Sequence, residues 1–132
     1  MPKSEMSAEI NKPDHRGLGH VLNATRYSLK GIKAALQNEE AFRLELLAMI
    51  VMLPAAIFLG QTGVERALMV GSLFLVLIAE LVNSAIEAIV DRISVEHHTL
   101  SGRAKDIGSA AVFMSLINVL AVWGFILADQ FL

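Results

Sequence analysis

The sequence contains no cysteine, and only 18% of its 132 residues are charged. The lack of cysteine excludes thiol nucleophiles, dithiol redox chemistry and zinc sites built on cysteine. The net charge of −2 excludes a strongly basic protein that binds nucleic acid through clustered lysine and arginine. The sequence also lacks the phosphate loop G-x-x-x-x-G-K-[ST] and the glycine loop of protein kinases, so any nucleotide would bind without a common nucleotide fold.

Hydrophobic residues are abundant instead, at 55% of the chain. Soluble domains contain roughly 45–50%, so this composition favours a lipid environment. Residues 46–64 and 107–128 carry no charge, and residues 67–90 carry only Glu80 and Glu87. A helix needs about 20 mainly apolar residues to span a bilayer. We therefore predict an all-α integral membrane protein with transmembrane helices at about 43–60, 67–91 and 106–128.

The N-terminal part of the chain has a different pattern. Residues 1–19 are polar and interrupted by proline and glycine, which predicts a mobile tail. Residues 20–38 predict an amphipathic helix at the membrane surface, and with the three spans they form one domain, 20–132. The polar stripe of this helix consists of Arg26, Lys30, Lys33 and Gln37.

Basic residues predict the orientation in the membrane. Of the eleven lysines and arginines, only Arg66 lies in the turn between the first two spans, and none follows the third. The others precede the first span or lie between the second and third. The positive-inside rule therefore places the N-terminus and the 92–105 loop in the cytoplasm and the C-terminus outside.

Glu80 is the most informative residue because a charge near the bilayer centre costs about 2.5–3.5 kcal/mol and usually marks a functional site. Helical spacing puts five polar residues on one stripe about 100° wide, which runs from membrane depth to the cytoplasmic surface. They are Glu80, Asn83, Ser84, Glu87 and Asp91. Such oxygen ligands suit Mg²⁺, and the deepest carboxylate suits general-base catalysis. The alternative is a hydrogen-bonded patch that holds an oligomer together. Asp91 can alternatively form an ion pair with Arg92 or Arg103 at the surface of the membrane.

A second acidic group begins the first span, where Glu39, Glu40 and Glu45 flank Arg43. These carboxylates can bind a metal from a neighbouring helix or pair with Arg43 along their own helix. Spacing alone leaves Glu39 and Glu40 equivalent. The loop before the third span holds Lys105 beyond a turn at Ser101 and Gly102. This loop suits phosphate binding, and equally an ordinary basic flank.

Residues 80–112, ELVNSAIEAIVDRISVEHHTLSGRAKDIGSAAV, resemble the signature of the prokaryotic integral-membrane diacylglycerol kinases. RYSLKGIKAAL followed by NEEAFRLE resembles the surface helix and first-span entry of the same family. The resemblance implies a homotrimer in the bacterial inner membrane, with active sites shared between subunits. It also implies transfer of the γ-phosphoryl group of Mg·ATP to diacylglycerol, with phosphatidic acid as the product.

The resemblance assigns roles residue by residue. Glu80 matches the catalytic base, and Glu39 and Glu87 match the Mg²⁺ ligands. Glu45 and Ser109 fall in the lipid-substrate region, where we also expect Asn83. The residues that match the nucleotide site are Tyr27, Glu96, His97, His98, Lys105 and Asp106.

Two other functions remain as alternatives. A related kinase could phosphorylate undecaprenol by the same chemistry, although EAIVDRI and SGRAKD are closer to the diacylglycerol branch. A small oligomeric channel or proton-relay subunit could instead use Glu80 and Asp91 as titrating groups.

Overall fold

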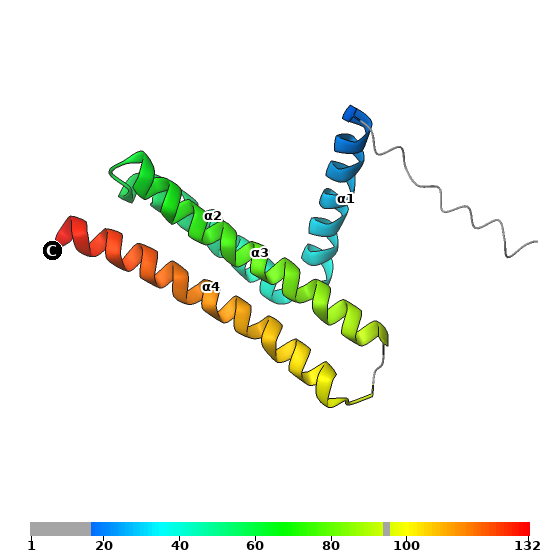
Figure 1. The fold of residues 1–132 in the computed structure, drawn as a ribbon. Coiled ribbons are helices and arrows are strands. Elements are labelled where there is room, and N and C mark those ends of the chain that lie inside the picture. The colour runs from blue at the N-terminus through cyan, green and yellow to red at the C-terminus, as the bar shows by residue number, and fades with distance from the viewer. Residues whose placement is uncertain (1–16, 94–95) are drawn as a thin grey trace, which may run out of the picture. The chain divides into compact units, whose positions relative to one another are not determined.

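The computed structural model describes residues 17–93 and 96–132, and these residues form four helices (Figure 1). The helices are α1 (Gly17–Asn38), α2 (Glu40–Leu59), α3 (Gly63–Ile93) and α4 (Thr99–Phe131). Helices α2, α3 and α4 are each long and apolar enough to cross a membrane. The predicted all-α membrane fold is therefore confirmed.

The helices extend beyond most of the predicted bounds. Helix α1 begins at Gly17 rather than His20, and most of the predicted tail, residues 1–16, lies outside the described residues. Helix α3 runs from Gly63 to Ile93, beyond both ends of the predicted span 67–91. A charge-free run marks the apolar part of a helix, and the helix itself continues into polar surroundings.

The largest correction concerns the start of α4, which begins at Thr99 and not at residue 106. Ser101, Gly102 and Lys105 therefore belong to the first turns of a helix, and the predicted turn at Ser101–Gly102 is wrong. His98 is the N-cap, and its Nδ1 accepts a hydrogen bond of 3.1 Å from the backbone N–H of Leu100. This side chain satisfies one of the backbone donors that a helix start leaves unpaired.

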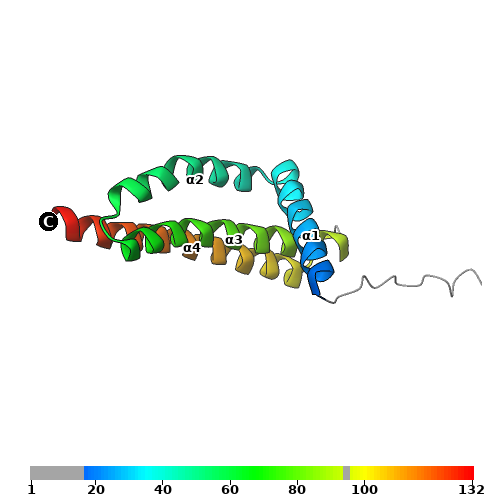
Figure 2. The ribbon, with the colours of Figure 1, turned by 90° about the horizontal axis from the view of Figure 1, so that it is seen from above.

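The chain divides into two compact units between Ala34 and Ala35. The second unit contains α2, α3 and α4, and α3 is its central helix because it packs against both α2 and α4. Helices α3 and α4 run antiparallel and side by side in both views (Figures 1 and 2). Residues on α3 therefore have neighbours on two other helices.

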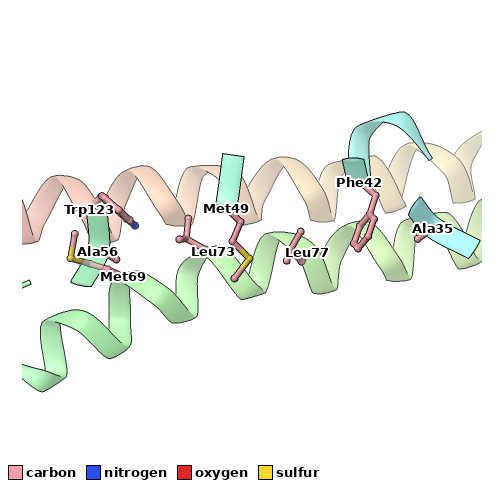
Figure 3. Close-up of a cluster of buried hydrophobic side chains, with 8 residues drawn as sticks. All are labelled: Ala35, Phe42, Met49, Ala56, Met69, Leu73, Leu77 and Trp123. Carbon is pink, nitrogen blue, oxygen red and sulfur yellow. The ribbon is translucent and has the colours of Figure 1, made fainter. Parts of the chain in front are cut away.

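Figure 3 shows the buried apolar cluster of this unit. The buried residues of α2 are Phe42, Met49 and Ala56, which recur every seven positions. This spacing gives a narrow seam of the kind found between coiled helices. The seam meets three buried residues of α3 and one of α4: Met69, Leu73, Leu77 and Trp123. Pro54 lies inside α2, which continues through it as one helix.

One buried hydrogen bond joins α3 and α4 within the apolar region. Trp123 Nε1 donates to Ser72 Oγ over 3.1 Å, and Ser72 Oγ donates in turn to the backbone carbonyl of Met69 over 2.6 Å. An indole N–H in an apolar environment needs such a partner. The bond therefore fixes how the two helices face one another.

Candidate active site

Helix α3 carries the polar stripe in the order that its spacing predicts. Glu80 and Asn83 are buried, with 7% and 8% of their surface exposed. Ser84 and Glu87 are half-buried, and Asp91 is exposed. Exposure therefore rises along one helix face from Glu80 to Asp91.

The carboxyl groups of Glu45 on α2 and Glu80 on α3 lie close enough together to interact electrostatically. Glu39 and Glu87 also lie near enough to Glu80 for their charges to repel it. The two acidic groups that are separate in the sequence thus form one cluster at the α2–α3 interface. Among the described residues, Glu45 Oε2 is buried without a hydrogen-bond partner.

Asn83 connects this cluster to α4. Its Nδ2 donates a hydrogen bond of 3.2 Å to Glu87 Oε1, one turn further along α3. Its Oδ1 lies against Gly108 of α4, where a Cβ atom would overlap it. Gly108 leaves room for the amide in this orientation, in which Asn83 also donates to the Glu87 carboxylate.

Glu39 and Glu87, which the resemblance matches to Mg²⁺ ligands, both lie within electrostatic range of Glu80. Glu39 is the N-cap residue of α2, but its carboxylate accepts no hydrogen bond from the backbone N–H groups at the helix start. Within residues 17–93 and 96–132, no three acidic or imidazole groups converge closely enough to hold a metal by themselves. This arrangement fits Mg²⁺, which commonly takes one or two carboxylates and completes its shell with water and phosphate oxygens.

Asp91 forms an ion pair with Lys105 of α4, with 2.6 Å between Lys105 Nζ and Asp91 Oδ1. The predicted partners were Arg92 and Arg103. Arg92 is next to Asp91 in sequence and so points away from it on the helix, and Lys105 approaches from the neighbouring helix instead.

Two adjoining cavities lie beside this ion pair, where α3 ends and α4 begins. They share the lining residues Val90, Glu96, His97, His98 and Ser101. The larger cavity, about 430 Å³, is completed by the apolar side chains of Ile93, Leu100 and Ala104. The smaller, about 200 Å³, is completed by Asp91, Gly102 and Lys105. Together they form one hollow that is open to the surface, with an apolar compartment at Ile93, Leu100 and Ala104 and a charged compartment at Asp91 and Lys105.

The remaining predicted site residues are less closely grouped. Asp106 and Ser109 are exposed on α4 and do not line either cavity. Tyr27 is exposed on α1, where the Lys30 ammonium lies 5.8 Å from the centre of its ring. That distance lies just inside the limit of about 6 Å for a cation–π contact.

Sequence reasoning missed the role of Gly108 and the partner of Asp91. Gly108 lies in a charge-free run among other small residues, where nothing distinguishes it from a glycine on a lipid-facing surface. Lys105 and Asp91 are both visible in the sequence, but their pairing depends on the register between α3 and α4.

The comparisons with known proteins agree with one another. The family model described as prokaryotic diacylglycerol kinase matches residues 26–127. A protein of Haemophilus influenzae named diacylglycerol kinase is 53% identical over 111 residues, which cover 84% of this chain and 94% of that protein. Proteins of the same name from Pseudomonas aeruginosa and Escherichia coli K12 are 51% and 45% identical. Their matches cover 84% and 87% of this chain, and 90% and 94% of the respective relatives.

Proposed function

The chain belongs to the prokaryotic diacylglycerol kinase family and is a lipid kinase; we propose that it phosphorylates diacylglycerol with ATP to give phosphatidic acid. The observation that carries this proposal is the continuous acidic face of α3. It begins at the buried Glu80, beside the half-buried Glu45 of α2, and ends at the charged cavity beside Asp91 and Lys105. The hydroxyl of a membrane lipid would bind at the buried end of this face, and a nucleotide from the aqueous phase would bind at the exposed end.

The nucleotide binds where α3 and α4 meet. Its base fits the apolar compartment at Ile93, Leu100 and Ala104, and its phosphates fit the charged compartment, where Lys105 supplies a compact positive charge. The other residues that we assign to the nucleotide are Tyr27, Glu96, His97, His98 and Asp106.

Glu39 and Glu87 would hold Mg²⁺ against the phosphates. When bound, the ion offsets the negative charge of the nucleotide and of the transferring phosphoryl group. Asn83 holds the Glu87 carboxylate in place through the 3.2 Å hydrogen bond. The protein's part in this step is therefore to present one carboxylate from α3, which Asn83 orients, and one from the start of α2.

Glu80 acts as the general base. The hydroxyl oxygen of diacylglycerol bonds to the γ-phosphorus, the bond from that phosphorus to the β-phosphate oxygen breaks, and ADP leaves. The hydroxyl proton moves to the Glu80 carboxylate. We assign the lipid-binding region to Glu45 and Asn83, which lie near the base, and to Ser109, which is exposed on α4.

We further propose that the protein is a homotrimer of the bacterial inner membrane, with sites shared between subunits and with its N-terminus and active site in the cytoplasm. The three spanning helices and the distribution of basic residues support the membrane location and the orientation. The trimer with shared sites rests on the family resemblance. Cross-linking in native membranes tests the trimer, since a ladder that stops at dimers would contradict it. Labelling of single cysteines introduced at each terminus tests the orientation.

The function is tested with purified protein in mixed micelles that contain Mg²⁺, ATP labelled in its γ-phosphate, and either diacylglycerol or undecaprenol. We expect labelled phosphatidic acid and little product from undecaprenol. Exclusive phosphorylation of undecaprenol would transfer the assignment to that alcohol. Phosphorylation of neither lipid would overturn the proposed reaction.

A further inference from the structure

Asp91 has no role in the mechanism above, although it makes the ion pair at the edge of the charged cavity. We propose that Asp91 is a positioning residue that holds the Lys105 ammonium at the phosphate-binding end of this cavity. The inference rests on the proposed function because it concerns the nucleotide that this reaction consumes.

The first argument is geometric. Asp91 is on α3 and Lys105 is on α4, and both line the smaller cavity. The 2.6 Å contact uses one Asp91 oxygen and one of the three ammonium protons. Lys105 can therefore keep this contact and still donate two hydrogen bonds to phosphate oxygens.

The second argument concerns what Lys105 would do without Asp91. Lysine carries its charge on a flexible four-carbon chain, so its position depends on a partner. The Glu87 carboxylate lies near enough to attract Lys105 electrostatically. Without Asp91, the ammonium would move toward Glu87 and compete there with Mg²⁺. Asp91 thus keeps the Lys105 ammonium beside the nucleotide phosphates, and the Glu87 carboxylate stays free to bind Mg²⁺.

The third argument separates positioning from stability. The side chains of Lys105 and Asp91 are 42% and 61% exposed, and exposed ion pairs contribute little to folding. An Asp91 variant should therefore fold normally and differ in its handling of the nucleotide.

The experiment compares Asp91→Asn with Asp129→Asn, the same change at an exposed aspartate near the other end of α4. In the full chain in mixed micelles, we expect Asp91→Asn to raise KM for Mg·ATP about fivefold, as the loss of one exposed ion pair allows. Values of kcat and of KM for diacylglycerol should stay within about twofold of the wild type, a range too small to reflect a lost interaction. Asp129→Asn should change none of the three. An unchanged KM for Mg·ATP in Asp91→Asn would overturn the inference.

A double-mutant cycle then asks whether Asp91 acts through Lys105. Calorimetric binding of a non-hydrolysable ATP analogue with Mg²⁺ is measured for Asp91→Asn, Lys105→Met and the double variant. We expect Asp91→Asn to weaken binding in the wild-type background and to have no further effect on Lys105→Met. An equal loss in both backgrounds would show that Asp91 does not act through Lys105. This binding measurement needs no lipid, so failure of the inference is distinguishable from failure of the proposed reaction.

Discussion

Gly108 of α4 lies directly against the side-chain amide of Asn83 on α3, with no room for a Cβ atom between them. The same amide donates to Glu87 Oε1, so the spacing of two helices is linked to the orientation of a proposed metal ligand. The active-site end of the helix pair therefore depends on a residue with no functional group of its own.

Replacing Gly108 by alanine should disturb both packing and activity. The added methyl group would overlap the end of the Asn83 side chain, which can rotate away. The main cost is then the loss of the hydrogen bond from Asn83 to Glu87, about 1–2 kcal/mol. We expect a lower thermal unfolding temperature in detergent and a higher Mg²⁺ requirement. Gly124→Ala is the matched control, because a Cβ atom at Gly124 would meet nothing within 4 Å. Equal effects of the two substitutions would contradict the proposed contact.

Glu80→Gln should lower kcat by about 10²-fold or more, since general-base catalysis contributes roughly 10²–10⁴-fold. Binding of Mg·ATP should be almost unchanged, because the base acts only on the lipid hydroxyl. Turnover and the calorimetric affinity for a non-hydrolysable analogue are measured on the same preparation, and retained binding shows that the variant is folded. A near-normal kcat would exclude Glu80 as the base.

Two further substitutions test the metal ligands. Glu39→Gln and Glu87→Gln should each raise the Mg²⁺ concentration for half-maximal activity about tenfold, because Mg²⁺ is held by few protein carboxylates and each one matters. Glu40→Gln should leave the Mg²⁺ titration unchanged, since that residue is exposed and the resemblance selects its neighbour. A shifted titration for Glu40→Gln and a normal one for Glu39→Gln would reverse the assignment.

The other end of the helix bundle should affect stability and not catalysis. Gln130 Nε2 donates to the carbonyl of Leu59 over 2.8 Å and to Glu65 Oε2 over 3.1 Å, which ties the end of α4 to the turn between α2 and α3. Gln130→Ala should lower the stability by about 1–2 kcal/mol. It should leave the initial rate unchanged and speed inactivation on heating.

Gln61→Ala is the control for this substitution. Gln61 contributes its backbone N–H to Glu65 over 2.7 Å, and alanine retains that group. If Gln130→Ala is as resistant to heat as Gln61→Ala, the two side-chain hydrogen bonds of Gln130 do not hold the helices together.

The sequence alone predicted the three spanning helices, the order of the stripe on α3 and the kinase family, all of which are confirmed. These features are local: the length of an apolar run sets the span, and helical periodicity determines which residues share a face. Helix ends were less predictable. Much of the predicted loop 92–105 is helical, because α3 continues to Ile93 and α4 already begins at Thr99. A helix can extend through polar residues, and the N-cap His98 starts α4 well before its apolar part.

Only the tertiary structure brought Glu45 to Glu80, paired Asp91 with Lys105 and set Asn83 against Gly108. Each contact joins two different helices and depends on their rotation and relative height. Many combinations of rotation and height bury similar apolar area, so the hydrophobic pattern does not choose among them. The choice depends on close packing, including the position at Gly108 where a side chain would not fit.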